Sequence, residues 1–195
     1  EFKADLDKII ELAKIFESDK IRLFSFYNFK GNEEMIIDCL GSAVEYTKPH
    51  GIKLYHENEL GIYGDSPKDC RYIVESTGCE CIFDPANFVQ CGQDTLQAWD
   101  MLKNRIHYMH IKDALADGTV VPAGCGNGHV PEIVADFIAR GGRALSVEPH
   151  LQVFKGLDTL ENDGQRTQLG KYEYESSDAA FDAACSAIKA IVEKV

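Results

Sequence analysis

Residues 106–110 read Ile-His-Tyr-Met-His, a short strand-like run that ends in a side chain able to bind a metal ion. Three further runs in the chain have the same form. The last residues of the four runs, spaced 27, 26 and 38 positions apart, are Glu57, Asp84, His110 and Glu148. Because a strand, a loop and a helix together occupy about 30 residues, each of these side chains falls once in a β/α unit, at the carboxyl end of its strand.

The carboxyl ends of the strands carry the active site in a β/α barrel, and we expect the four side chains to meet there. Two glutamates, an aspartate and a histidine offer oxygen and nitrogen ligands, which suit one divalent ion such as Mn, Mg, Co, Fe or Zn. Each motif by itself is ordinary, since Asp84-Pro85 is a common turn signal and a lone histidine on a strand is more often structural. Their shared register is what predicts a single metal centre.

Helical and strand-like patterns alternate along the rest of the chain. The predicted helices are 5–17, 33–48, 67–76, 94–103, 131–139 and 178–194, the last with Ser177 as its N-cap. The predicted strands are 21–27, 52–57, 80–84, 106–111 and 144–148. Strict alternation implies parallel strands joined by right-handed crossovers.

The number of predicted strands bears on how much of a barrel this chain holds. A closed (β/α)8 TIM barrel needs eight strands, and five are predicted here. We therefore expect residues 1–195 to form a single domain, the C-terminal two-thirds of a β/α barrel with strands four to eight, and the first third to be missing. An open doubly wound sheet is the alternative, but no GxGxxG turn follows the first strand.

The composition limits which cellular environments and which partners are compatible with the protein. The 195 residues carry a net charge of −12 with 45% hydrophobic residues, which disfavours a nucleic acid or an anionic membrane as partner. No apolar run is long enough for a transmembrane helix, and the first residues lack the apolar core of a signal peptide. The seven cysteines, an odd number without a paired framework, indicate reduced thiols and a cytoplasmic protein.

Other side chains near the strand ends are candidates for substrate contacts. Strand alternation sends Glu59 to the same side as Glu57, and Lys112 to the same side as His110. The Lys112 ammonium can stabilise a developing oxyanion or bind a carbonyl, which makes it a catalytic candidate. The candidates for substrate binding are Glu59, Asn87 and His150.

A glycine-rich loop follows the strand of His110. It spans residues 121–128 and reads Val-Pro-Ala-Gly-Cys-Gly-Asn-Gly. Such a loop can be mobile and close over a ligand, or offer backbone amides to an anion. It is not a P-loop, because no Gly-Lys-Ser/Thr sequence follows.

Five segments of this chain resemble the xylose-isomerase-like TIM barrels, commonly called sugar phosphate isomerase/epimerases, whose superfamily includes endonuclease IV. The segments are HENELGIYGD (56–65), FDPANFVQ (83–90), HIKDA (110–114), VPAGCGNG (121–128) and LSVEPHL (145–151). The resemblance implies one divalent metal ion held by Glu57, Asp84, His110 and Glu148. Many relatives have a histidine three residues after the aspartate, and Asn87 at that place disfavours an endonuclease-like centre with several zinc ions.

The resemblance also implies a reaction. Epimerases of this type work through a cis-enediolate, in which a carboxylate removes a proton next to a carbonyl and a second one returns it. Glu148 is then the better candidate base and Glu57 its partner, acting on a ketose or keto-sugar. The alternative is a lyase or dehydratase that expels a β-leaving group from an inosose or a keto-glycoside.

Other functions are less compatible with these residues. Hydrolysis of abasic DNA conflicts with the acidic charge and with Asn87, and a non-catalytic subunit conflicts with the intact ligand set. Phosphate is compatible with a ligand such as Arg22, on a predicted strand, although the sequence does not select it. Family members often form homo-oligomers, and no residue here marks such an interface.

Overall fold

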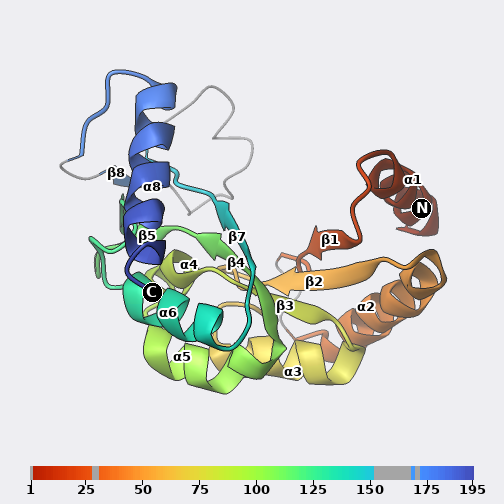
Figure 1. Cartoon of the computed structure of the whole chain (residues 1–195). Helices are drawn as coiled ribbons and strands as arrows, with labels where there is room; N and C mark the ends of the chain where they lie inside the picture. Colours follow the sequence, from red (N-terminus) through yellow and green to blue (C-terminus); the bar gives the residue numbers. More distant parts are fainter. Residues whose placement is uncertain (1, 28–30, 152–167, 170–171) are drawn as a thin grey trace.

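The computed structural model describes residues 2–27, 31–151, 168–169 and 172–195 of the chain (Figure 1). The helices are α1 (Phe2–Ile15), α2 (Glu33–Thr47), α3 (Pro67–Thr77), α4 (Pro85–Gln90), α5 (Thr95–Leu102), α6 (Val130–Ala139) and α8 (Ser177–Val192). Short 3-10 helices, η1 (Lys48–His50) and η2 (Lys103–Arg105), follow α2 and α5. The strands are β1 (Lys20–Leu23), β2 (Lys53–Glu57), β3 (Glu80–Phe83), β4 (Ile106–Ile111), β5 (Asp113–Ala114), β6 (Thr119–Val121), β7 (Ala144–Val147) and β8 (Gln168–Leu169).

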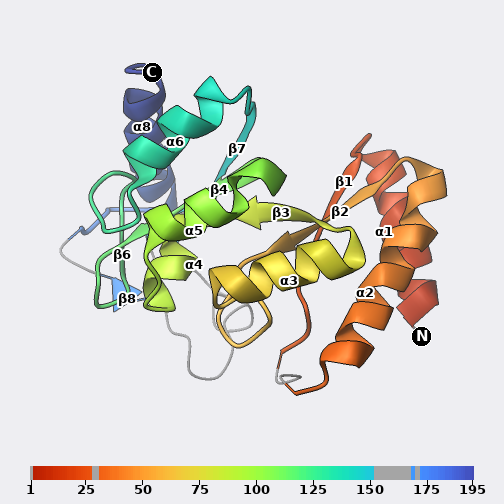
Figure 2. The ribbon, with the colours of Figure 1, turned by 90° about the horizontal axis from the view of Figure 1, so that it is seen from below.

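Within the described ranges, five strands form one parallel sheet in the order β1-β2-β3-β4-β7. The sheet curls, and α2, α3, α5 and α6 cover its outer face (Figures 1 and 2). Neighbouring strands in the sheet are successive β/α units of the chain, as right-handed crossovers require. This confirms the predicted alternation and the fold, which is part of a (β/α)8 TIM barrel.

Local signals place several of the elements where the sequence predicts them. Ser66 caps α3 by accepting the backbone N–H of Asp69, and Pro67 occupies the first turn. Gly78 ends α3 in the left-handed conformation with φ of 77°, which suits a residue without a side chain. These signals set where α3 begins and ends, so that the chain returns to the sheet as β3 beside β2.

Some predicted boundaries are wrong by a few residues, each for a local reason. The first strand ends at Leu23 rather than at residue 27, since Phe26 adopts a left-handed φ of 63° that breaks the extended chain. The N-cap of α8 is Ser176, whose side chain accepts the N–H of Ala179, and Ser177 is the first helical residue. Asp84 and Pro85 do not form a simple turn, because they begin the unpredicted helix α4.

The hydrophobic core lies between the sheet and the covering helices. Phe83 of β3 stacks against Phe88 and against Trp99 of α5, with ring centroids 5.1 and 5.4 Å apart. The indole N–H of Trp99 donates to Asp136 Oδ2 at 2.7 Å, so the buried ring keeps a polar partner. Truncating one such core aromatic to alanine typically costs about 3–5 kcal/mol. This packing fixes the β3 end that carries Asp84.

Two edges of the curled sheet are open in the part of the chain that the structure describes. Strands β1 and β7 each pair with one neighbour, and exposed apolar side chains lie on α1, such as Leu12, and directly after it, at Phe16. No helix within the described ranges combines the length and the apolar character needed to cross a membrane.

Candidate metal centre

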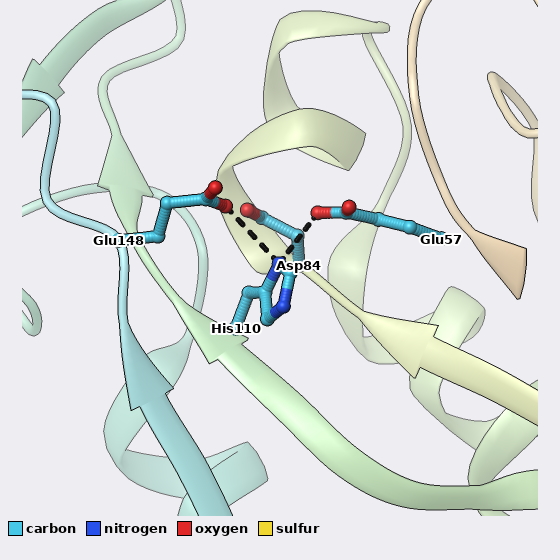
Figure 3. Close-up of side chains that lie close together, drawn as sticks. All are labelled: Glu57, Asp84, His110 and Glu148. Atoms are coloured by element: carbon cyan, nitrogen blue, oxygen red, sulfur yellow. Dashed lines mark hydrogen bonds and ion pairs between the residues drawn. The ribbon is translucent and has the colours of Figure 1, made fainter. Parts of the chain in front are cut away.

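The four residues that end the strand-like runs lie together at one end of the sheet (Figure 3). Glu57 is the last residue of β2, Asp84 follows β3, His110 lies in β4 and Glu148 follows β7. One ligand atom from each lies within 4.8 Å of the ligand atoms of the others. The parallel order explains this, since the carboxyl ends of all these strands point to the same rim.

Glu57 is held from two sides. Its Oε1 lies 2.7 Å from His110 Nδ1, and its Oε2 accepts a hydrogen bond of 2.8 Å from Nη1 of Arg22 in β1. Burial of Glu57 raises its pKa, but the hydrogen bond and charge of His110, together with Arg22, outweigh burial and hold the pKa below its usual value. The Glu57 carboxylate is therefore ionised.

His110 bridges the two glutamates. Its Nδ1 lies 3.0 Å from Glu148 Oε2 as well as 2.7 Å from Glu57 Oε1. Burial lowers the pKa of His110, but the two carboxylates outweigh it and raise the pKa to about 10. Burial likewise raises the pKa of Glu148, and His110 and Lys112 reverse this to bring it to about 2. The His110 imidazolium therefore places a positive charge between the two glutamates, in addition to those of Lys112 and Arg22.

Asp84 has one anchored and one unanchored oxygen. It is the N-cap of α4, and its Oδ1 accepts the backbone N–H of Asn87 at 3.1 Å. Its Oδ2 is fully buried and lacks a hydrogen bond, although Lys112 Nζ stands 3.2 Å away at ion-pair distance. Burial, only partly offset by Lys112, raises the pKa of Asp84 to about 7. A buried carboxylate oxygen without a hydrogen bond is unfavourable unless a cation is paired with it, and the Lys112 ammonium is the cation beside it here.

The four ligand atoms fit a divalent cation. Metal–ligand bonds of about 2.0–2.4 Å place ligands on opposite sides of an ion about 4.0–4.8 Å apart. The observed limit of 4.8 Å lies at the upper end of that range. Three carboxylates and an imidazole suit hard or borderline divalent ions, and the unbonded Asp84 oxygen supplies a site for one of the bonds.

Two of the predicted substrate contacts, Asn87 and Glu59, meet beside this centre. The Asn87 amide donates to Glu59 Oε2 at 3.5 Å and to the carbonyl of Asn58 at 2.8 Å. His150 lies two residues beyond Glu148, with a left-handed φ of 45°, and its charge helps lower the pKa of Glu148. Lys112, with 6% exposure, lies against Asp84 as described above. The structure thus brings the predicted candidates to the same rim.

Asn58 has a role that strand alternation missed. The amide of Asn58 donates to the Asp84 carbonyl at 2.8 Å, and its Oδ1 accepts the Asp84 N–H at 2.8 Å. Strand β2 ends at Glu57, so Asn58 lies beyond the strand, where alternation does not apply. The side chain instead extends the β2–β3 pairing and holds the backbone of Asp84.

Asp113 is a second residue that the sequence did not reveal. Its buried carboxylate accepts the backbone N–H groups of Gly124, Gly126 and Gly128 at 2.9, 3.0 and 2.9 Å. A Cβ atom on Gly126 would stand 2.3 Å from Asp113 Oδ1, so only glycine fits there. The expectation that these amides face an external anion is wrong, because an internal carboxylate holds them. The Gly-x-Gly-x-Gly spacing that begins eleven residues after Asp113 would have been the signal.

Comparisons with known proteins agree with this fold. The family model of the xylose isomerase-like TIM barrel matches residues 1–162. An inosose dehydratase of Mesomycoplasma hyopneumoniae is 33% identical over 83 residues, which are 41% of this chain and 28% of that protein. The chain thus matches less than a third of the length of that curated relative.

Two solved structures have the same fold. The L-ribulose 3-epimerase structure superposes with a TM-score of 0.73 at 17% identity, covering 98% of this chain and 67% of that one. A xylose isomerase-like TIM barrel protein from Mycobacterium smegmatis in complex with magnesium gives a TM-score of 0.71 at 13% identity, covering 97% and 66%. With the family model matching most of its length, the chain belongs to the xylose isomerase-like TIM barrel family.

Proposed function

We propose that the protein is a divalent-metal-dependent isomerase or epimerase that acts on a ketose or keto-sugar through a cis-enediolate. The observation that carries this proposal is the ring of Glu57, Asp84, His110 and Glu148, whose ligand atoms lie within 4.8 Å of one another. A divalent ion bound there, of Mn, Mg, Co, Fe or Zn, would polarise the substrate carbonyl and stabilise the negative oxygen that forms.

Each side chain has a separate task in this proposal. Asp84, His110 and the two glutamates would hold the ion, and Glu148 would remove the proton from the carbon next to the carbonyl. Glu148 is the most accessible of the three carboxylates, with 34% of its side chain exposed. Lys112, Glu59, Asn87 and His150 border the same rim, where they orient the substrate oxygens.

A lyase or dehydratase is the alternative that a specific observation favours. The curated relative with 33% identity over 83 residues is an inosose dehydratase. The same enolate would form after proton removal, and a β-hydroxyl would then leave as water in place of reprotonation at carbon. Isomerase and lyase thus share every residue of the centre up to that step.

The domain we propose is larger than the curled sheet. In the part of the chain that the structure describes, β1 and β7 are the open edges of the sheet, and a closed barrel has eight strands. We propose that residues 1–195 are the C-terminal two-thirds of one barrel domain, with three further β/α units before residue 1. Assembly into a homo-oligomer is part of the same proposal.

The decisive experiment measures bound metal and product together. The metal-free protein is loaded with each candidate ion, and its content is measured by elemental mass spectrometry. We expect one ion per chain in the wild type and in the surface variant Glu75→Gln, and its loss in the Asp84→Asn, Glu148→Gln double variant. An isomer of unchanged mass from a ketose panel supports the isomerase, and a product lacking one water supports the lyase. Failure to bind any of the ions would refute the proposal.

A further inference from the structure

We infer that Arg22 reserves Glu57 for metal binding and leaves Glu148 as the one carboxylate of the centre that moves the substrate proton. The inference rests on the proposed function and narrows it. If a single carboxylate moves the proton, the proton leaves and returns on one face of the substrate. The expected reaction is then a one-face isomerisation or an elimination, and not an epimerisation.

Two of the three carboxylates have an oxygen anchored by the protein. Asp84 Oδ1 accepts the N–H of Asn87 at 3.1 Å, and Glu57 Oε2 accepts Nη1 of Arg22 at 2.8 Å. The other oxygen of each carboxylate faces the ring of ligands. Asp84 and Glu57 therefore each present one oxygen to a metal ion and keep none for a proton.

Glu148 differs from Asp84 and Glu57 in the hydrogen bonding of its second oxygen, and it is more exposed than Glu57. Its Oε2 lies 3.0 Å from His110 Nδ1, and within the described part of the chain no hydrogen bond holds its Oε1, although the charges of Lys112 and His150 act on the carboxylate. Its side chain is 34% exposed, against 2% for Glu57. Glu148 can therefore bind through one oxygen and receive a proton on the other.

The anchor on Glu57 is a strong one. A hydrogen bond between a guanidinium and a carboxylate is charge-assisted and roughly twice as strong as a neutral one. The guanidinium is itself held, with its central carbon 4.7 Å from the centre of the Phe24 ring. Moving a proton onto Glu57 Oε2 would break this bond and leave Arg22 facing a neutral acid.

The position of the two glutamates gives this anchor its chemical meaning. Glu57 and Glu148 approach His110 from opposite sides (Figure 3). Epimerisation needs removal of a proton on one face and delivery on the other, which two such glutamates would perform if both were free. With Glu57 Oε2 bound to Arg22, Glu57 is not available as the second proton carrier.

The steps left to Glu148 balance without a co-reactant. Glu148 takes the proton, the C–H electron pair forms a carbon–carbon double bond, and the carbonyl π pair moves onto oxygen. In isomerisation, Glu148 returns the proton to the former carbonyl carbon, and the hydroxyl proton passes from one oxygen to the other. In elimination, the oxygen pair re-forms the carbonyl, the C=C pair shifts to join the α and β carbons, and the β C–O bond breaks. Glu148 gives its proton to the departing hydroxyl, which leaves as water.

The first test needs no substrate. Metal-free protein is treated with a water-soluble carbodiimide and glycinamide, and modified carboxylates are located by peptide mass spectrometry. We expect Glu148 to react and Glu57 to be protected. Arg22→Gln should let Glu57 react at a rate near that of Glu148, Arg22→Lys should restore most of the protection, and Arg71→Gln, which breaks only an exposed pair with Glu75, should change nothing.

Either of two results would overturn the role of Arg22. In one, Glu57 of the wild type reacts as fast as Glu148. In the other, Glu57 stays protected in Arg22→Gln, so that burial alone shields it. Arg22 is 47% exposed, and its replacement is not expected to unfold the protein.

The second test measures proton transfer to and from the substrate. Protein with a measured full complement of Mn²⁺ is incubated in D₂O with ketoses and a 2-keto-inositol, and products are followed by NMR. At full metal occupancy, Glu148→Gln should lower deuterium incorporation about a hundredfold or more, and Glu57→Gln should stay within about tenfold of the wild type. No epimer should form, except in Arg22→Gln, where the second oxygen of Glu57 is released.

The outcomes separate the inference from the proposed function. An epimer as the main wild-type product, or the reverse order of the two glutamate variants, overturns the inference while supporting metal-dependent proton transfer. If no ketone reacts at full occupancy, the proposed function fails, and the carbodiimide result still decides whether Arg22 anchors Glu57.

Discussion

At the scale of single residues, the centre depends on Lys112 and Asp84, which are both buried and lie 3.2 Å apart. Removing one partner of a buried pair leaves an uncompensated polar group, which typically costs about 3–5 kcal/mol. We predict that Asp84→Asn and Lys112→Met each destabilise the metal-free protein by about that amount. The double variant should lose clearly less than the sum. Urea unfolding of the four proteins measures this coupling, and additive losses would contradict it.

The charge of His110 makes a pH-dependent contribution in the metal-free protein. Its pKa is raised from 6.5 to about 10 by Glu148 and Glu57, against the effect of burial. A raised pKa gives stability that is complete below about pH 6.5 and is lost as the pH rises through about 10. We therefore predict a falling melting temperature over this range for the metal-free protein.

Two comparisons check the assignment of this pH dependence to His110. The slope should vanish in His110→Asn and persist in His107→Gln, which changes an exposed histidine of the same strand. It should also weaken in metal-loaded protein, since a metal-bound imidazole is neutral. A slope that remains in His110→Asn would assign it to another group.

At the scale of elements, the glycine-rich loop is bound to the end of β4 through Asp113. Asp113→Asn removes the charge that three backbone N–H groups share, and Gly126→Ala places a Cβ atom 2.3 Å from Asp113 Oδ1. We predict that each variant lowers the free energy of unfolding by about 2–3 kcal/mol. Because both break the same contacts, the double variant should be little worse than either single one.

The loop also contacts the metal-binding side of the rim. A Cβ atom on Gly128 would stand 3.0 Å from Pro85 Cβ, directly after Asp84. The melting temperature and the metal affinity of Asp113→Asn should therefore both differ from those of the wild type, as thermal unfolding and metal titration would measure. Gly41→Ala in α2, where nothing lies within 4 Å, is the matched control and should stabilise by about 0.5–1 kcal/mol. If the losses in free energy of unfolding of Asp113→Asn and Gly126→Ala add fully in the double variant, the two residues do not act through the same contacts.

At the scale of the whole molecule, β1 and β7 are open edges of the sheet among the described residues, and apolar side chains of α1 and of the residue after it are exposed to water. Leu12 is 51% and Phe16 is 77% exposed. Open strand edges and clustered apolar side chains favour association. We predict that the 195-residue chain associates with rising concentration, and that Leu12→Lys with Phe16→Lys reduces this without lowering the melting temperature. Light scattering after size-exclusion chromatography measures it, and a monomer at all concentrations would contradict the prediction.

The order of the strands and the four ring residues could be predicted because both depend on local sequence. A strand-like run with a metal-capable last residue specifies where a side chain lies along its strand, and parallel pairing then brings all such ends to one rim. The start of α3 at Ser66 and its end at Gly78 follow from capping rules that involve a few neighbouring residues. Short-range interactions of this kind can be predicted from the sequence alone.

The sequence by itself therefore determined the βα alternation, the parallel sheet and the residues that its rim collects. Only the tertiary structure decided which oxygen of each carboxylate is anchored and which is free. Arg22 and Glu57 are 35 residues apart, and Asp113 and Gly128 are 15 apart, so neither contact follows from periodicity or propensity. The physical reason is that hydrogen bonds between distant elements depend on how the sheet curls and the loop packs, to within fractions of an ångström.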